Sequence, residues 1–319
     1  MNSTADLSSK TITVIGGTGF VGRAVVEALA QRGAKIIVLT RNTEKAKQVK
    51  LFGHVGQITA VSGSALDDAR LRSVIEPADI VINLVGILAP SGAQSFDAVQ
   101  AKLPETIGRL AAESDVDRVI HMSAIGADIK SASAYARSKA EGERGLLRQF
   151  ENSVILRPSI IFGPGDGFFN RFGRMAMMAP ALPLIGGGKS KMQPVYVGDV
   201  ADAVMAVLAD STTSGQIYEL GGPRIYSFAE LMAYILEVTE RSRQLVSVPF
   251  SLMAIPAALA SLLPNPPLTP DQLRLLKVDN VVSGDLPTIS DLGISPASVE
   301  SVVPEYLASY RPGGRFGIR

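Results

Sequence analysis

Short apolar runs alternate with longer amphipathic stretches along the first half of the chain. The runs, such as TITVI at residues 11–15 and KIIVLT at 35–40, are nearly continuous in apolar character and rich in β-branched residues, which is typical of strands covered on both faces. The stretches between them have the length of helices. The pattern predicts strands at residues 11–15, 35–40, 57–61, 79–85, 118–122 and 153–156, separated by helices at 20–31, 43–52, 67–75, up to about 114, and 132–150.

This alternation of strands and helices predicts a parallel sheet with right-handed crossovers, because consecutive parallel strands need a crossover connection. We therefore expect an α/β fold built on a Rossmann-type, doubly wound parallel sheet. After residue 157 the regular alternation of strands and helices ends at loops rich in glycine and proline. Two later strands, at 194–197 and 216–220, flank a helix at 199–208 and are expected to rejoin the main sheet.

A smaller, mostly helical C-terminal lobe is also predicted. Its helices are expected at residues 228–240, 250–263, 270–278 and 297–310. We therefore expect a nucleotide-binding domain at residues 8–165 plus 193–225, and a smaller lobe at 166–192 plus 226–319.

Composition narrows the function classes. The chain has 319 residues with 31 Lys and Arg against 30 Asp and Glu, and the resulting net charge of +1 argues against electrostatic binding of nucleic acid. It contains no cysteine, which excludes disulfides, a thiol nucleophile and Cys-based metal centres. The two histidines, His54 and His121, are too few for a His-rich site, so no metal is expected.

No targeting or membrane-spanning segment is expected. The first ten residues, MNSTADLSSK, lack the apolar core of a secretory signal. The longest uncharged run, residues 244–270, is interrupted by prolines, so a straight spanning helix of about 20 apolar residues does not fit it. Its core at 250–263 has the length of either a helix buried in the lobe or an interfacial helix that contacts a membrane or a partner.

A glycine-rich motif directly follows the first predicted strand. The segment Gly16-Gly17-Thr18-Gly19-Phe20-Val21-Gly22 satisfies both G-x-x-G-x-x-G and G-x-G-x-x-G. Its glycines allow a tight turn and close approach of the backbone to a pyrophosphate, and the following helix N-terminus offers N–H groups to the phosphates. Because the motif also begins a βαβ unit, we predict a dinucleotide-binding site here.

The residues at the end of the second predicted strand favour binding of NADP(H) over NAD(H). An NAD site usually places Asp or Glu about 20 residues after the motif, to bind the ribose 2′-hydroxyl. Here the strand ends Leu39-Thr40-Arg41-Asn42 without a carboxylate, so Arg41 is a candidate partner for a 2′-phosphate, with Arg23 as a second cation. The other candidate cofactor-binding residues are Asn42 and a group at or near the ends of later strands: Ser64, Ala65, Leu84, Val85, Gly86, Met122, Pro158 and Ile160.

A Tyr-x-x-x-Lys pair, Tyr135 and Lys139, lies on the helix predicted after the fifth strand. A spacing of four residues puts both side chains on one helix face, where the ammonium is expected to lower the pKa of the phenol. Ser123, just after the fifth strand, is a candidate to polarise a carbonyl group. These three residues form the candidate catalytic set and also candidate cofactor contacts; the alternative is an ordinary helix that happens to carry a tyrosine.

Together, the glycine motif, Ser123, the Tyr135 and Lys139 pair, and the strand end Leu156-Arg157-Pro158 resemble the short-chain dehydrogenase/reductase superfamily, in its extended or atypical branch. The resemblance covers nearly the whole chain. Two features depart from the extended pattern: Ile15-Gly16 stands where Thr-Gly is usual, and Gly63-Ser64 stands where Gly is often followed by an Asp that contacts adenine.

A narrower resemblance is to the short-chain-dehydrogenase-like accessory subunits of respiratory complex I, in their bacterial form. It is carried by VINLVGIL (81–88), HMSAIGAD (121–128), YARSKAEGE (135–143), ILRPSIIFGPGDGFFNRF (155–172), LPLIGGG (182–188), QPVYVGDVADAV (193–204) and YELGGP (218–223). The resemblance implies a tightly held structural NADPH (NADP+) and no turnover, which would leave the candidate catalytic set vestigial. It also implies a peripheral location on the cytoplasmic face of a bacterial inner membrane, with partners among complex I subunits of the peripheral arm and membrane junction.

One segment of the lobe is compatible with such a location. Aromatic residues and Met175 interleave there with Arg171 and Arg174, a pattern suited to a membrane surface or a partner groove, and lipid headgroups are a candidate contact. The alternative is a substrate-pocket lid or the core of the lobe. The aromatic residues are Phe168, Phe169 and Phe172, and Met177 and Met178 follow them.

Three functions therefore remain open at the level of sequence. The first is an NADPH-binding accessory subunit of NADH:quinone oxidoreductase. The second is a free NADP-dependent reductase, epimerase or dehydratase that uses Ser123, Tyr135 and Lys139. The third, a redox-sensing regulator that binds NADPH, has no specific support in the sequence.

Overall fold

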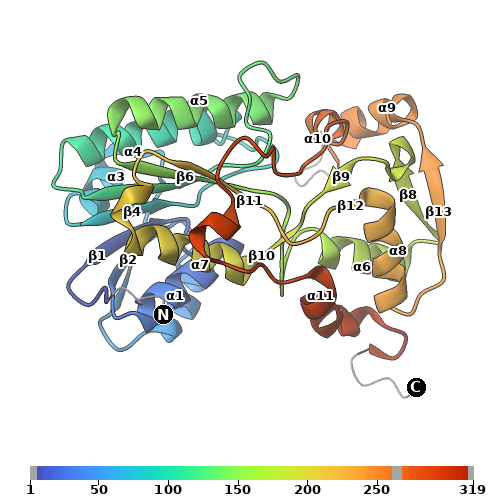
Figure 1. The fold of residues 1–319 in the computed structure, drawn as a ribbon, viewed down its shortest axis with the longest axis horizontal. Coiled ribbons are helices and arrows are strands. Elements are labelled where there is room, and N and C mark those ends of the chain that lie inside the picture. Colours follow the sequence, from blue (N-terminus) through green and yellow to red (C-terminus); the bar gives the residue numbers. More distant parts are fainter. Residues whose placement is uncertain (1–5, 261–267, 315–319) are drawn as a thin grey trace. The chain divides into compact units, whose positions relative to one another are not determined.

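A computed structural model of the chain describes residues 6–260 and 268–314 (Figure 1). The chain divides into two compact units. The first comprises the residues up to Arg157 together with Gly198–Glu219 and Gly284–Ile294, and the second comprises Pro158–Val197, Leu220–Ser283 and the residues from Ser295 onward.

The first unit is built on a seven-stranded sheet in the order β11-β6-β5-β4-β1-β2-β3. Every pairing from β3 across to β6 is parallel. This order is that of a doubly wound sheet, which confirms the predicted α/β, Rossmann-type fold class. The strands are β1 (Thr11–Ile15), β2 (Lys35–Thr40), β3 (Ile58–Ser62), β4 (Ile80–Asn83), β5 (Arg118–Met122), β6 (Ser153–Pro158) and β11 (Ile217–Leu220).

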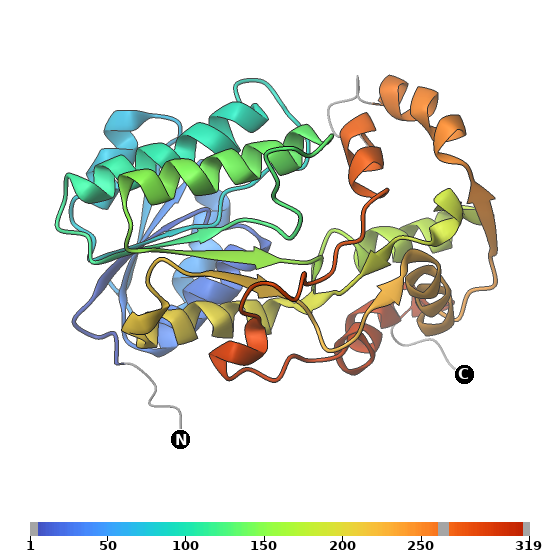
Figure 2. The same ribbon diagram turned by 45° about the horizontal axis from the view of Figure 1, so that its top comes forward.

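Helices cover both faces of this sheet (Figures 1 and 2). Helices α3 (Asp68–Ile75), α4 (Leu103–Ala112) and α5 (Ala134–Gln149) lie on one face, and α1 (Phe20–Gln31) and α7 (Val197–Ala209) lie on the other. The remaining elements of the unit are α2 (Thr43–Val49), the 3-10 turns η1 (Lys50–Phe52), η4 (Ser211–Thr213) and η5 (Ile289–Leu292), and a π-helix, η2 (Asp97–Lys102), that leads into α4.

The apolar side chains of the strands pack against the apolar faces of the helices. Val81 and Val119 of the sheet belong to one buried cluster with Leu71 of α3, Ile107 of α4 and Leu146 of α5. Burying one such side chain contributes about 1.5–3 kcal/mol. The near-continuous apolar strings of the sequence therefore correspond to strands with a helix layer on each side.

The second unit combines helices with short sheets. Its helices are α6 (Phe169–Met178), α8 (Phe228–Val238), α9 (Phe250–Ala260), α10 (Pro270–Leu275) and α11 (Val299–Leu307), with 3-10 turns η3 (Gly186–Gly188) and η6 (Ala308–Tyr310). Its two-stranded sheets pair β10 (Val195–Tyr196) with β7 (Ile161–Phe162), β12 (Tyr226–Ser227) with β9 (Lys191–Met192), and β13 (Gln244–Val248) with β8 (Ala181–Ile185).

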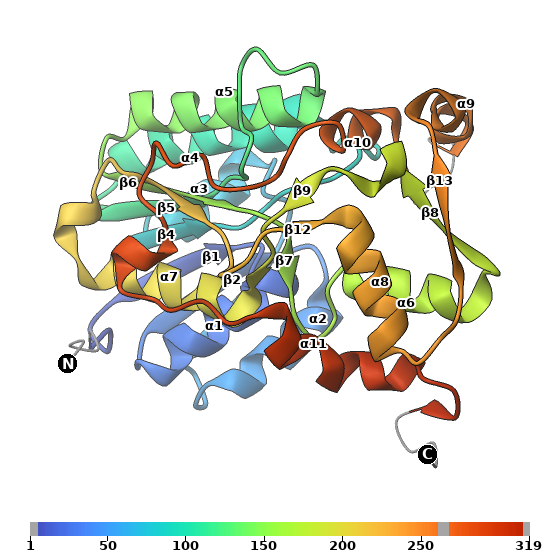
Figure 3. The same ribbon diagram turned by 45° about the vertical axis from the view of Figure 1, so that its right-hand side comes forward.

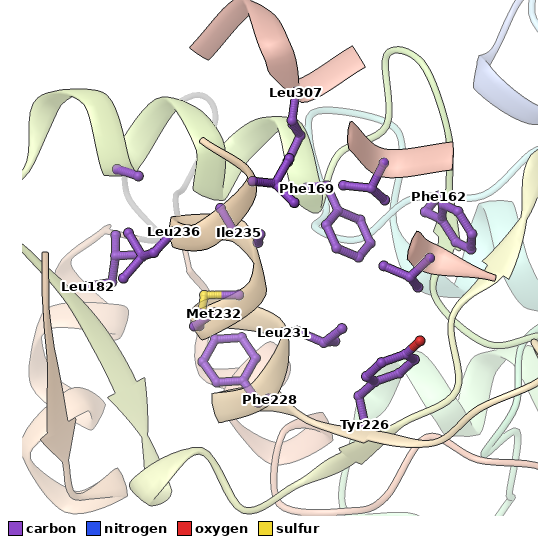
Figure 4. Close-up of a cluster of buried hydrophobic side chains, with 14 of the residues drawn as sticks. Phe162, Phe169, Leu182, Tyr226, Phe228, Leu231, Met232, Ile235, Leu236 and Leu307 are labelled. Atoms are coloured by element: carbon purple, nitrogen blue, oxygen red, sulfur yellow. The ribbon is translucent and has the colours of Figure 1, made fainter. Parts of the chain in front are cut away.

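Helices α6, α8 and α11 converge on the core of this unit (Figure 3). Phe162, Phe169, Leu231, Ile235 and Leu307 are among its fully buried side chains (Figure 4). The aromatic segment at the start of α6 is thus part of this core: Phe169 has no exposed surface, and Phe168 and Phe172 pack against the same cluster. The expectation that these phenylalanines face a membrane or partner is wrong, whereas Arg171, Arg174 and Met178 are exposed.

Several sequence-based boundaries also change. The strand expected at 194–197 does not join the main sheet; β10 spans two residues and pairs with β7 instead. Residues 284–294, expected in the lobe, belong to the first unit because Pro287 O accepts the Glu219 N–H at 2.8 Å, next to the edge strand β11. The helix expected at 250–263 is described to Ala260, and residues 261–263 lie outside the described residues.

Two features are absent from the described ranges 6–260 and 268–314. No helix there is long and apolar enough to cross a bilayer. No group of three or more His, Cys, Asp or Glu side chains there is placed to hold a metal ion.

Candidate nucleotide-binding site

A cavity of about 360 Å³ lies at the carboxyl ends of β1 to β4. The strand order reverses between β1 and β4, and doubly wound sheets bind ligands in the crevice at this point. The cavity is lined by Ile15, Gly16, Thr18, Gly19, Leu39, Thr40, Arg41, Asn42, Lys45, Gly63, Ser64, Ala65, Leu66, Leu84, Val85, Gly86, Gln94, Val99 and Leu103.

The glycine motif forms the turn between β1 and α1. Gly16 has a φ of 87°, and a Cβ atom there would lie 3.2 Å from the Leu84 carbonyl carbon and from Val85 Cγ2. A Cβ atom on Gly22 would lie 2.7 Å from the Gly17 Cα, so the first turn of α1 approaches this loop as closely as glycine permits. The turn therefore keeps this close packing beside the cavity only because both positions lack side chains.

The start of α1 offers free donors to an anion. Gly19 is its N-cap residue, and no side chain caps the helix or places a carboxylate in its first turn. An uncapped helix N-terminus carries unpaired N–H groups and the positive end of the helix dipole. The residues present therefore fit a pyrophosphate at this place.

Two cations line the end of the cavity next to β2. Arg41 follows β2, and Lys45 lies in the first turn of α2. The Asn42 side chain caps α2 by accepting the Lys45 N–H at 2.9 Å, and this cap fixes where the helix begins. None of the lining side chains is a carboxylate, so the pair suits an additional phosphate better than a ribose hydroxyl.

Arg23 lies elsewhere. Its Nη1 donates to Gln48 Oε1 at 2.8 Å, and its guanidinium lies 5.7 Å from the centre of the Phe52 ring. It is not among the lining residues, so the structure does not bring this predicted second cation to the cavity. Lys45 takes that place, although the sequence analysis did not single it out.

The other predicted cofactor residues divide into those that line the cavity and those that do not. Ser64, Ala65, Leu84, Val85 and Gly86 line the cavity as expected. The motif residues Gly17, Phe20, Val21 and Gly22 shape the turn and the first turn of α1 without lining it, and Met122 and Pro158 end β5 and β6. Ile160 belongs to the second unit and packs against its core.

Lining residues from the π-helix segment were also missed. Val99 lies in η2, Leu103 begins α4, and Gln94 precedes both. Their sequence carries no polar motif, and short π-helical insertions frequently occur at functional sites. Only the folded structure shows that this segment lies around the same cavity as the glycine motif.

Lys139 lies buried at the end of β5. It is 4% exposed, and its Nζ donates to the Met122 carbonyl oxygen at 2.9 Å. A Cβ atom on the lining residue Gly86 would lie 3.5 Å from this Nζ, so Lys139 lies close to the cavity without being one of its lining residues. Burial lowers the pKa of Lys139 to about 8, and the Glu143 carboxylate opposes this shift.

Tyr135 precedes Lys139 by one helical turn, and its ring contacts Phe96 edge to face, with centroids 6.0 Å apart. The pKa of Tyr135 is raised by burial to about 12. The expectation of a lowered pKa is therefore wrong, because removal of the phenol from water disfavours the charged phenolate.

Glu143 continues the same face of α5. Its carboxylate accepts two hydrogen bonds from Arg157, at 2.8 and 2.5 Å, and the pair anchors the end of β6 to α5. Ser123 Oγ, the remaining member of the predicted catalytic set, is buried without a hydrogen-bond partner among the residues that the structure describes.

The strand order, the glycine turn at an uncapped helix N-terminus and the cavity over the switch point define a doubly wound α/β protein of the dinucleotide-binding class. A sequence profile of the NAD dependent epimerase/dehydratase family matches residues 12–221. The chain therefore belongs to the NAD dependent epimerase/dehydratase family.

Individual relatives are similar over nearly the whole chain. NADH dehydrogenase (ubiquinone) 1 alpha subcomplex subunit 9 from Arabidopsis thaliana mitochondria is 33% identical, covering 97% of this chain and 80% of its own. The mitochondrial protein of the same name from Mus musculus is 33% identical, covering 96% and 82%. The predicted resemblance to complex I accessory subunits is thus confirmed.

Solved structures show the same fold. A double mutant of DesIV, a dTDP-glucose 4,6-dehydratase from Streptomyces venezuelae with NAD bound, superimposes with a TM-score of 0.70. The match covers 93% of this chain and 95% of that one, at 21% sequence identity.

Proposed function

We propose that this protein is an NADPH-binding accessory subunit of respiratory complex I, the NADH:quinone oxidoreductase. The observation that carries the proposal is the similarity over 97% of the chain to a relative named as a subunit of NADH dehydrogenase. Its partners are then other subunits of the peripheral arm and the membrane junction. In a bacterium its location is peripheral, on the cytoplasmic face of the inner membrane, where lipid headgroups are a candidate contact.

The cavity supports NADP(H) as the nucleotide. The start of α1 suits the pyrophosphate, while Arg41 and Lys45 suit the 2′-phosphate that distinguishes NADP(H) from NAD(H). On this assignment the adenosine half lies over β2 and β3, near Ser64 and Ala65. The nicotinamide half extends past Gly86 towards Lys139.

The nucleotide acts as a structural ligand in this proposal. A ligand that binds only the folded form adds RT ln(1 + [L]/Kd) to stability, about 4 kcal/mol at a thousandfold excess over Kd. That is a large share of the roughly 5–15 kcal/mol that separates folded from unfolded domains. Nucleotide bound at the β1–α1 turn would therefore hold the first unit rigid whatever its redox state.

A free NADP-dependent reductase, epimerase or dehydratase is the second candidate. It is favoured by one specific observation: Ser123 directly follows β5, Tyr135 and Lys139 lie on α5, and the Ser123 hydroxyl is buried without a partner among the described residues. Against it, Tyr135 would have to lose a proton from a phenol whose pKa is raised to about 12 by burial.

Gentle isolation of the native protein tests the proposal. We expect it to co-purify with the membrane-bound respiratory complex and to release NADPH or NADP+ on denaturation, as measured by mass spectrometry. A free, nucleotide-free protein would contradict it. A Tyr135→Phe variant separates the two candidates: assembly and respiratory activity should be unchanged for the accessory subunit, whereas a free enzyme should lose its turnover.

A further inference from the structure

His121 on β5 is a buried histidine with one ring nitrogen bonded and the other not. It is 1% exposed, and its Nδ1 lies 3.1 Å from the Asn83 Nδ2 on the neighbouring strand β4. The Asn83 Oδ1 accepts the Val85 N–H at 3.2 Å, which identifies Nδ2 as the donor of the amide. His121 Nδ1 is therefore an acceptor, and a neutral ring must carry its proton on Nε2.

The ring is neutral because burial lowers the pKa of His121 well below its usual range, and the positive charge of Lys139 lowers it further. Its Nε2–H is thus a fixed donor that cannot become an acceptor while the Asn83 bond persists. This nitrogen has no hydrogen-bond partner within the described part of the chain. A buried donor of this kind calls for an acceptor atom.

The hydroxyl of Ser123 is a second buried polar group without a hydrogen-bond partner in the described part of the chain, and it lies on the same face of the sheet. The Ser123 N–H donates to Leu156 O at 2.7 Å, so the β5–β6 ladder continues through Ser123. Side chains alternate along a strand, and His121 and Ser123 therefore point to the same face. That face is covered by α4 and α5, since Val119, two residues before His121, packs in one cluster with Ile107 and Leu146.

The spacing of the two residues suits one shared atom. The Cα atoms of alternate strand residues lie about 6.6 Å apart, and one oxygen can bond two side-chain atoms that lie up to about 6 Å apart, so two neighbouring side chains on this face can share it. Lys139 donates to the carbonyl oxygen of Met122, the residue between them, so its ammonium lies beside this place. An electron-rich oxygen there would also offset a buried positive charge.

We propose that His121 Nε2–H and Ser123 Oγ bind one common oxygen atom beside Lys139, with His121 as the positioning residue that Asn83 orients. The oxygen belongs either to an ordered water molecule or to the nicotinamide half of a bound dinucleotide. Only the second source rests on the proposed function. Val85, which orients Asn83, lines the cavity, so the chain of hydrogen bonds links the β4 edge of the nucleotide site to the end of β5.

Nitrogen NMR of histidine-labelled full-length protein tests this directly. The chain has two histidines, and the exposed His54 serves as the internal reference, with His54→Gln for assignment. Spectra are compared for nucleotide-free protein, for protein with 2′,5′-ADP and for protein with NADP+. We expect the Nε2–H form of His121, with a hydrogen-bonded proton protected from exchange, in at least one of these samples.

The three samples distinguish a water oxygen from an oxygen of the nicotinamide half. A bonded Nε2–H signal already present without nucleotide, and unchanged by either addition, assigns the oxygen to water. A bonded signal that forms with NADP+ but not with 2′,5′-ADP assigns it to the nicotinamide half. An Nδ1–H form, or an Nε2–H without hydrogen-bond signature in all samples, overturns the inference. Calorimetry with NADP+ on the same sample shows separately whether the proposed nucleotide binding fails.

Two variants isolate the shared atom. Ser123→Ala should weaken the bonded signal, seen as proton exchange at His121 Nε2 at least about tenfold faster. The control is Ser153→Ala, which removes a buried serine on β6 that bonds to Phe150 O, and should leave His121 unchanged. An unaltered His121 signal in Ser123→Ala would show that the two side chains do not share a ligand atom.

Discussion

Arg157 and Glu143 form a bidentate ion pair, with Arg157 Nε 2.8 Å and Nη2 2.5 Å from the two carboxylate oxygens. Their side chains are 17% and 4% exposed. Removing one partner from a buried pair leaves an uncompensated charge and costs about 3–5 kcal/mol. We therefore expect Glu143→Gln to lower the free energy of unfolding by several kcal/mol, measured by denaturant titration.

The matched control is the exposed pair Lys47 and Glu44 on α2, whose side chains are 72% and 76% exposed. Water screens such a pair, so Glu44→Gln should leave the denaturation midpoint unchanged. Equal effects of the two substitutions would refute the structural importance of the buried pair.

Arg41→Ala and Lys45→Ala should each reduce the proposed preference of the cavity for NADP+ over NAD+. A charge-assisted hydrogen bond is worth about 1.5–3 kcal/mol, so the affinity for NADP+ should fall by roughly 10- to 100-fold, while NAD+ binding changes little. Calorimetric titration of each variant with both nucleotides measures the ratio.

Arg23→Ala provides the control for this prediction. Arg23 bonds to Gln48 and lies outside the cavity lining, so its removal should leave the ratio of the two affinities as it is. If Arg23→Ala shifts the ratio and Lys45→Ala does not, the assignment of the second cation is wrong.

Gly22→Ala should disrupt the β1–α1 turn. The added methyl would lie 2.7 Å from the Gly17 Cα, a backbone atom that cannot rotate away. Overpacking of this kind costs about 1–3 kcal/mol, and the displaced turn should also weaken nucleotide binding. Gly167→Ala, where a Cβ atom would meet nothing within 4 Å, is the control and should unfold like the unsubstituted protein. Thermal unfolding with and without NADP+ compares them.

The buried ammonium of Lys139 gives the nucleotide-free protein a pH dependence above neutrality. Burial lowers its pKa to about 8 from an ordinary 10.5, so between these values the unfolded chain binds more protons than the folded one. The free energy of unfolding should therefore rise with pH in this window, by up to about 3 kcal/mol from this group. Tyr135 has the opposite effect and lowers the free energy of unfolding as the pH rises above its ordinary pKa of 10.0, because its pKa in the folded protein is about 12.

Lys139→Met should remove this rise. Denaturant titrations of both proteins between about pH 7 and about pH 10 measure the difference, in which all other groups cancel. Parallel pH profiles for the two proteins would show that Lys139 keeps its ordinary pKa in the folded state.

The first unit was largely predictable because its strands are buried on both faces. Apolar strings such as residues 11–15 and 118–122 leave little choice of structure, and they became β1 and β5 with the same bounds. The short strands of the second unit were not predictable in this way. β8 pairs with β13, beginning with Ala181 opposite Gln244, and such a distant pairing leaves no local periodicity to detect.

The site shows the same division between local and distant information. Gly16 and Arg41 were found because a motif and a strand end fix them locally, and both line the cavity. Lys45 was missed because its position depends on where the Asn42 cap starts α2 relative to β1. The direction of the Tyr135 pKa was wrong for a related reason: a sequence shows the neighbouring lysine but not the depth of burial.

The return of residues 284–294 to the first unit has a consequence for how the molecule is assembled. The family profile ends at residue 221, yet the Glu219 N–H donates to Pro287, and Glu219 also forms a β-bridge with Thr288. A ribosome that has made only the matched region has not yet supplied the last backbone contacts of its sheet edge. The sheet of the first unit is therefore complete only after most of the second unit has been synthesised. A fragment that ends at residue 221 would leave the outer backbone edge of strand β11 unpaired and prone to pairing with other chains.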